Sequence, residues 1–69
     1  MGYIIAVKGP ETRHTMEEYN GGNTIAEARR EAAFFVEHCP KARIRICTVD
    51  ESTDDCKLVT KEVVQEGEA

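Results

Sequence analysis

The segment from Thr24 to Cys39 constrains the fold most, because it carries the clearest helical pattern in the chain. Thr24 and Glu27 match a capping box, in which an N-cap threonine and a glutamate three residues later satisfy each other's backbone N–H groups. Alanine, arginine and glutamate, which favour helices, fill most of the run. Pro40 disfavours the helical conformation of the residue before it. The pattern therefore predicts a helix that begins at Thr24 and ends at Cys39.

Two strand-like segments stand on each side of this helix. Tyr3–Val7 is a short apolar run that stops at a Gly-Pro turn, and Thr12–Tyr19 alternates weakly, as an edge strand does. Arg43–Val49 alternates cleanly between apolar and polar residues, and Leu58–Val64 follows a polar loop. Two hairpins joined by one helix predict an α+β fold: a four-stranded, mostly antiparallel sheet in the order β-β-α-β-β, with the helix packed on one face.

A chain of 69 residues has room for one domain. We expect residues 1–64 to form it and residues 65–69 to form a flexible C-terminal tail. The face of the last strand stays open, since either choice places Lys61 or Glu62 in the middle of the buried side. The expected core consists of Tyr3, Ile5, Val7, Met16, Ile25, Ala28, Ala32, Phe35, Val36, Ile44 and Ile46.

One helix covers only one face of a sheet, so the other face is where we expect a function. Arg43 and Arg45 alternate onto this open face and form a small basic stripe suited to phosphate or carboxylate. A solvated strand face is the alternative and the favoured interpretation, because any half-buried strand alternates in this way. Ile4 and Ala6 also lie on the open face, and we therefore expect a homodimer or a partner that covers it.

Phe34 is the helix residue that fits the amphipathic pattern least. At 100° per residue it lies about 150° from the centre of the apolar stripe, among charged and polar residues that include Arg30 and His38. An aromatic side chain on that side favours a partner contact, since aromatic residues are enriched in interfaces. A single exposed apolar side chain is also ordinary. A rotation of the helix that buries both Phe34 and Phe35 remains open.

The loop from Asp50 to Asp55 holds four acids in six residues. It lacks the glycine and the glutamate of a calcium-binding loop, so a solvated turn or an acidic patch that competes for a nucleic-acid groove are the two interpretations. The net charge of −4 disfavours non-specific binding to nucleic-acid phosphates. The candidate partner-binding residues are therefore Phe34, Arg30, His38, Arg43, Arg45, Asp54 and Asp55.

The cysteines and histidines show no spacing that supports catalysis or metal binding. Cys39, Cys47 and Cys56 form an odd set without a C-x-x-C pair, which predicts reduced thiols rather than disulfides or a zinc site. His38 and Cys39 are neighbours on a helix and point about 100° apart, so they do not form a nucleophile–base pair. The chain also shows no secretory signal and no membrane-spanning run. We expect a cytoplasmic, non-enzymatic protein with no cofactor, no metal and no membrane partner.

Three segments, Tyr3–Ile5, Thr24–Ala32 and Arg43–Ile46, together resemble small phage and prophage proteins. Anti-CRISPR inhibitors of the type I surveillance complexes are among those proteins, and the opening of the helix is also similar to that of HicB-type antitoxins. The resemblance covers residues 3 to 49 in element order and helix pattern, and it carries no functional residue across. It implies an inhibitor that binds stoichiometrically to a host protein or nucleoprotein complex.

The alternative function is a nucleic-acid-binding sheet that uses a basic open face. The charges around this face distinguish the two hypotheses. Nucleic acid is favoured if cations gather there, and protein is favoured if acids intermix with them. The cations to consider are Lys8, Arg13, Arg43, Arg45 and Lys61.

Overall fold

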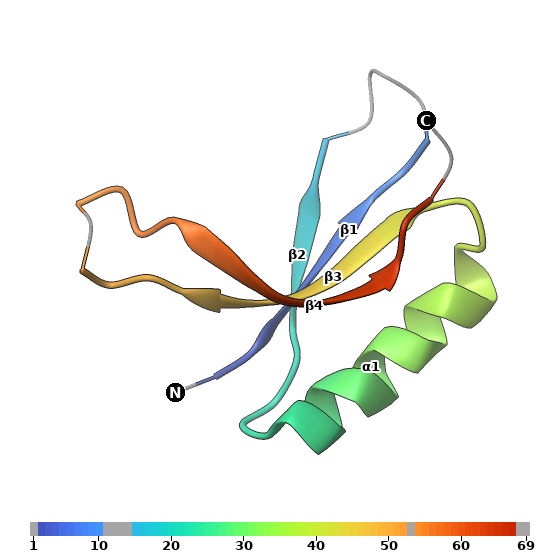
Figure 1. Ribbon diagram of the computed structural model, residues 1–69. Helices are drawn as coiled ribbons and strands as arrows, with labels where there is room; N and C mark the ends of the chain where they lie inside the picture. The colour runs from blue at the N-terminus through green and yellow to red at the C-terminus, as the bar shows by residue number, and fades with distance from the viewer. Residues whose placement is uncertain (1, 11–14, 53, 68–69) are drawn as a thin grey trace.

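A computed structural model describes residues 2–10, 15–52 and 54–67 of the chain. These residues form β1 (Ile4–Lys8), β2 (Glu17–Asn20), α1 (Ile25–His38), β3 (Arg43–Val49) and β4 (Leu58–Gln65). The strands make one antiparallel sheet in the spatial order β2-β1-β3-β4, and α1 lies along one of its faces (Figure 1). The predicted α+β fold is confirmed.

The core lies between α1 and the two central strands. The inward residues of β1 and β3 are branched aliphatic side chains, and they pack against two helix alanines that allow the helix to approach the sheet closely. The buried cluster consists of Ile5, Val7, Ala28, Ala32, Ala42, Ile44 and Ile46. Tyr3, Ile25, Phe35, Val36, Cys39 and Val64 are partly buried around it.

The helix begins where the capping box predicts. The Thr24 hydroxyl accepts a hydrogen bond from the Glu27 N–H at 3.1 Å, and the Glu27 carboxylate accepts one from the Asn23 N–H at 2.7 Å. Gly22 precedes the cap with a φ of +83°, and a Cβ there would overlap the Glu27 side chain. Only glycine therefore fits this turn without strain.

Within the described residues, no helix is long and apolar enough to span a membrane.

β4 runs one residue further than predicted. The Gln65 side-chain amide donates hydrogen bonds to the carbonyl oxygens of Cys39 at 2.8 Å and Ala42 at 2.6 Å. These bonds join the end of β4 to the turn that follows α1. Gln65 therefore belongs to the sheet and not to the expected tail, of which Glu68 and Ala69 lie outside the described residues.

β2 is turned the other way from the prediction. The register pairs Tyr19 with Ile5 and Glu17 with Val7, so Tyr19 faces the helix. Met16, predicted to be in the core, is 51% exposed. The reason is the Tyr19 ring, which stacks on Phe35 with 4.6 Å between ring centroids. The expected first part of this strand, residues 12–14, lies outside the described residues.

Two register shifts in the β3–β4 pair decide which residues of β4 face the helix. They lie between Ile44 and Arg45 and between Ile46 and Cys47, so the simple alternation of β4 is broken twice. Glu62 comes to lie opposite Ile46, on the helix side of the sheet. Its carboxylate forms an ion pair with Arg29 of α1 at 2.7 Å.

Candidate functional site

The candidate site residues fall on two surfaces and one loop. Along the outer side of α1, Arg30, Phe34 and His38 are spaced by four residues, so they form a row on one face of the helix. On the sheet face away from α1, Arg43 and Arg45 lie beside Lys8. Asp54 and Asp55 are exposed in the β3–β4 loop, at the far end of β3 from Arg43.

We call the first surface the aromatic surface; it consists of Tyr19, Phe34, Phe35 and His38. Phe34 is 57% exposed and meets the half-buried Phe35 edge to face, with 5.5 Å between centroids and an interplanar angle of 90°. The centroid of the His38 ring lies 4.3 Å from that of Phe34. Phe35 in turn stacks on Tyr19 of β2. Four rings thus form a continuous row from the sheet edge across the helix, and the predicted outward position of Phe34 is confirmed.

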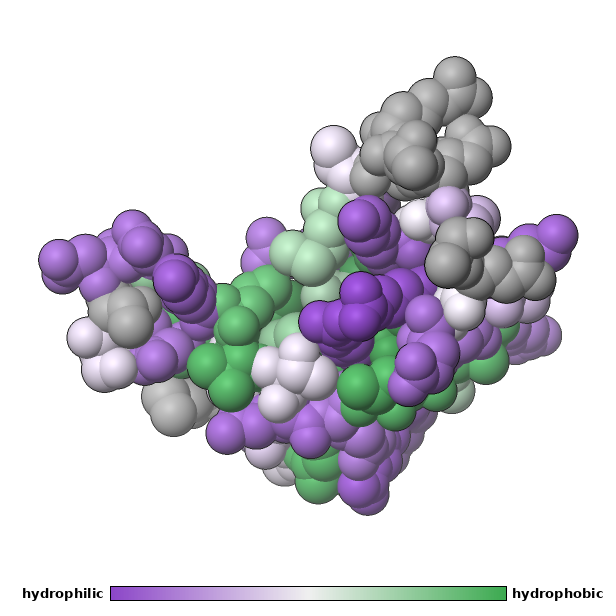
Figure 2. Space-filling view, turned by 45° about the horizontal axis from the view of Figure 1, so that its top comes forward, coloured by the Kyte–Doolittle hydropathy of each residue, from purple (hydrophilic) through white to green (hydrophobic). Residues whose placement is uncertain are grey.

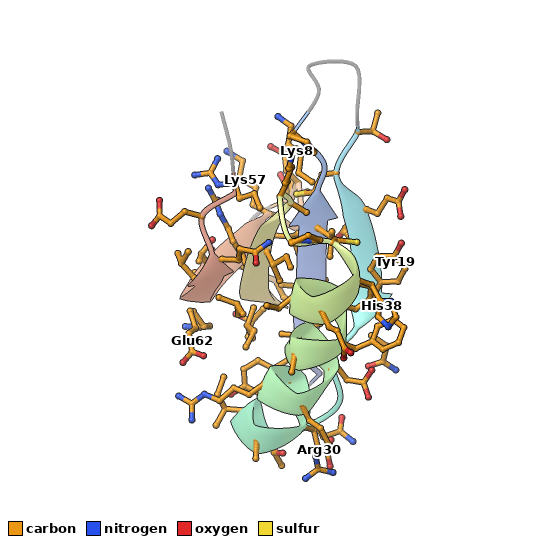
Figure 3. The ribbon with its side chains drawn as sticks, turned by 90° about the vertical axis from the view of Figure 1, so that its right-hand side faces the viewer. Lys8, Tyr19, Arg30, His38, Lys57 and Glu62 are labelled. Carbon is orange, nitrogen blue, oxygen red and sulfur yellow. The ribbon has the colours of Figure 1, made fainter. Side chains whose placement is uncertain are left out.

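Tyr19 and His38 lie on the same side of the molecule, one from β2 and the other from the end of α1 (Figure 3). The Tyr19 hydroxyl donates a hydrogen bond to the Glu17 carboxylate, and this bond raises the pKa of Tyr19. The phenol therefore stays neutral at physiological pH. It presents an apolar ring with a polar tip, as interface tyrosines do.

An apolar groove of about 620 Å³ opens beside the aromatic surface, at the C-terminal end of α1. Val7, Tyr19, Phe35, Cys39 and Pro40 are among the residues that line it. Its volume falls within the ~300–1,000 Å³ typical of small-molecule and peptide-anchor pockets. The exposed rings therefore adjoin a concave surface that can receive an apolar group.

We call the second surface the basic hollow; it is lined by Ala6, Lys8, Thr15, Met16, Arg43 and Arg45 and has a volume of about 440 Å³. Lys8 stands directly opposite Arg43 in the β1–β3 register, and Ala6 stands opposite Arg45. The sequence pattern predicts Arg43 and Arg45 as candidate binding residues, whereas Lys8 is only one of the cations to consider around this face. The signal was present, since Lys8 is the next residue after Ala6 on the same face of β1.

The basic hollow lacks an internal counter-charge in the described part of the chain. Among the described residues, no side-chain hydrogen bond or ion pair engages Lys8, Arg43 or Arg45, and the buried Nε of Arg45 has no partner. A buried donor left unpaired costs about 1–3 kcal/mol, and like charges directly across two strands repel. In Figure 2, strongly hydrophilic residues (purple) lie among hydrophobic ones (green) in the middle of the view. Charged and apolar side chains are therefore mixed on this face of the molecule.

The sheet face away from α1 is partly shielded although no helix in the described part of the chain covers it. Ala6 is 4% exposed and Cys47 is 2% exposed on this face. Long neighbouring side chains must cover them, and arginine often lays its aliphatic stem over apolar surface in this way. Val63, opposite Arg45, remains 49% exposed. The expected homodimer stays a prediction. Because these residues are already shielded, dimerisation would bury less apolar area than a fully exposed sheet face would offer.

The structure does not bring Asp54 and Asp55 to either surface. In the same loop, the Asp50 carboxylate accepts hydrogen bonds from the hydroxyl and the N–H of Ser52, which lower the pKa of Asp50. The three cysteines are free thiols: Cys39 is half-buried, Cys47 is buried and Cys56 is exposed. Among the described residues, no three His, Cys, Asp or Glu side chains are grouped to hold a metal ion. His14 lies outside the described residues.

The two surfaces differ in what they can bind. The aromatic surface suits apolar and aromatic groups of a partner, and the basic hollow suits an anion. No protein-family model, curated protein or solved structure matches this chain. The contacts and charges of these two surfaces therefore indicate what the protein can bind.

The Arg29–Glu62 ion pair predicts a pH dependence of stability. The hydrogen bonds from Arg29, at 2.7, 3.1 and 3.2 Å, lower the pKa of Glu62. A carboxyl whose pKa is lowered by folding stabilises the fold above its unfolded pKa, and this contribution is lost as the pH falls through its folded pKa. We expect the Tm of Glu62→Gln to fall less than that of the wild type between neutral pH and about pH 3.

Thermal unfolding followed by circular dichroism at a series of pH values measures this difference. Glu66→Gln is the matched control, because Glu66 is an exposed glutamate just beyond β4. Its acid-induced fall in Tm should equal that of the wild type. A Glu62→Gln profile parallel to the wild type would show that the ion pair does not stabilise the fold.

Proposed function

We propose that the protein is a non-enzymatic, stoichiometric binding module that docks on a protein or nucleoprotein complex through the aromatic surface. The observation that carries this proposal is Phe34, whose ring is 57% exposed yet contacts the rings of both Phe35 and His38. A ring held in this way loses little conformational freedom on binding, and aromatic anchors dominate interface energies.

The neighbours of Phe34 support the same proposal. Arg30 precedes it by one helical turn, and arginine is enriched with tyrosine and tryptophan at interface hot spots. The 39% exposed Tyr19 extends the row to the sheet edge, and the apolar groove lies next to it. Ring, cation and groove together offer a partner both flat and concave contact area.

The finer part of the proposal rests on the resemblance of residues 3 to 49. It is that the protein acts in the cytoplasm as an inhibitor of phage or mobile-element origin, similar to anti-CRISPR proteins. The proposed target is a host complex, and the protein would inhibit it by covering a surface that the complex needs for its function. No catalytic residue is needed for such an action.

The proposal is tested by affinity capture from a lysate of host cells, with and without nuclease, using the wild type, Phe34→Ala and Val59→Ala. Val59 is the control, because it is a 38% exposed apolar residue on β4, away from the aromatic surface. We expect Phe34→Ala to lower the affinity for a specific partner by about 10-fold or more, equivalent to about 1.4 kcal/mol, and so to lower the captured amount. Val59→Ala should capture as much as the wild type. Equal capture by all three proteins would contradict the proposal.

A nucleic-acid-binding sheet is the second candidate, and the basic hollow is the observation that favours it. Lys8, Arg43 and Arg45 gather there, as this function requires. Glu18 also lies on the face, opposite Ala6, so an acid borders the cations. Arg13 lies outside the described residues. Nuclease treatment in the capture experiment separates this candidate from a direct protein contact.

A further inference from the structure

We propose that the basic hollow is a binding site for a compact phosphate-bearing anion, such as the phosphate or diphosphate group of a small ligand. This site lies on the sheet face away from α1. It is separate from the aromatic surface and does not depend on the function proposed for that surface.

Three cationic side chains, those of Lys8, Arg43 and Arg45, lie close together around the basic hollow. Lys8 and Arg43 are a direct cross-strand pair, whose Cβ atoms lie about 4.5–5.5 Å apart in such a register. Arg45 is two residues further along the same face of β3 and diagonal to Lys8, a separation of about 7–8 Å. All three side chains are long, and all three line one hollow. Their charged ends can therefore reach one ligand together.

The side chains of these three cations have no hydrogen-bond or ion-pair partner among the described residues. In the described part of the chain no carboxylate pairs with Lys8, Arg43 or Arg45, and the Nε of Arg45 is buried without an acceptor. An oxyanion relieves both the repulsion between Lys8 and Arg43 and the unpaired donor. Guanidinium groups bind phosphate oxygens through two parallel N–H···O bonds, and a lysine adds a point charge.

The surroundings of the basic hollow favour a compact ligand over a long one. A nucleic acid longer than the hollow would extend over the rest of a protein whose net charge is −4. There it would approach Glu18 and the acids of the β3–β4 loop, which repel its phosphates. A compact anion avoids these carboxylates. The hollow, at about 440 Å³, is within the ~300–1,000 Å³ of small-molecule sites, and Met16, Ala6 and Thr15 provide uncharged lining for the rest of the ligand.

Isothermal titration with pyrophosphate at low ionic strength tests the site. We expect saturable binding of one pyrophosphate per chain by the wild type. Arg43→Gln and Arg45→Gln should each lower the affinity by about 10-fold or more. Arg30→Gln is the matched control, because it also removes one guanidinium charge, at the opposite end of the molecule from Lys8 (Figure 3). It should stay within about 2-fold of the wild type, and so should Phe34→Ala.

Arg45→Lys separates specific recognition from charge alone. It keeps the positive charge but loses the paired donors, so we expect its affinity to fall, although less than that of Arg45→Gln. Circular dichroism confirms the fold of each variant. Absence of saturable binding to the wild type would overturn the proposal, and so would an equal loss in Arg30→Gln. Tighter binding of an eight-residue oligothymidylate than of pyrophosphate, abolished by Arg43→Gln, would overturn the compact ligand in favour of single-stranded nucleic acid.

Discussion

Replacing Ile46 by alanine is expected to lower the free energy of unfolding by about 3–5 kcal/mol, because it leaves a cavity at the centre of the core. Ile46 is 0% exposed, lies opposite Ile5 of β1, and belongs to the buried cluster that includes Ala28 and Ala32 of α1. Small side chains already line the helix side of this cluster, so none can move in to fill the space. A domain of this size has a total stability of about 3–10 kcal/mol, so the change removes a third of it or more.

Urea denaturation followed by circular dichroism measures the loss as a lower midpoint with an unchanged slope. Val63→Ala is the control on the same hairpin, because Val63 is 49% exposed on the sheet face away from α1. It should change the stability by no more than about 0.5 kcal/mol. A cost below about 1 kcal/mol for Ile46→Ala would show that β3 turns its other face to the helix.

The elements with strong local signals could be predicted from the sequence. The helix has a capping residue at one end and a proline just beyond the other, and its observed bounds, Ile25–His38, lie between the predicted caps. The strand Arg43–Val49 matches its prediction at both ends, since it alternates without interruption. In both segments the local pattern and the tertiary packing favour the same structure, so no long-range information was needed.

The faces of the two edge strands could not be predicted, because contacts far apart in the sequence decide them. β2 has polar residues on both sides, and the stacking of Tyr19 on Phe35 favours the orientation in which Met16 is exposed. In β4, two register shifts place Glu62 towards the helix, where Arg29 neutralises it. A bulge has no signature in a single strand's alternation, since it depends on the partner strand.

The candidate site shows the same division. The outward position of Phe34 follows from helix periodicity alone and is confirmed. The basic hollow depends on which residue of β1 stands opposite Arg43, and the register of two strands that are 35 residues apart (43 minus 8) is not visible in either strand. Asp54 and Asp55 were grouped with the other residues by charge only, and the structure leaves them apart in their loop.

Replacing Phe35 by alanine is expected to cost about 3 kcal/mol of unfolding free energy, near the lower end of the range for phenylalanine in a core. Phe35 is only partly buried, which reduces the area lost, but it also stacks on Tyr19 and meets the edge of Phe34. Each such aromatic pair contributes about 0.5–1.5 kcal/mol beyond the buried area. The loss of Phe35 also removes the contact that turns β2 towards the helix. We therefore expect weaker amide protection in β2 than in β3 when hydrogen exchange of the variant is compared with the wild type.

Phe34→Ala is the matched comparison, because it deletes the same ring one residue away. Its 57% exposed ring contacts Phe35 and His38 at the surface, where each contact contributes about 0.5 kcal/mol, the lower end of the range for aromatic pairs, and the higher helix propensity of alanine offsets about 0.5 kcal/mol of the combined loss. The net change should therefore stay within about 0.5 kcal/mol. Chemical denaturation of both variants measures the contrast. Equal destabilisation by the two changes would mean that both rings are buried in solution, which would remove the basis for Phe34 as a binding residue. A stable Phe34→Ala variant that no longer captures a partner, beside an unstable Phe35→Ala variant, would separate the two roles.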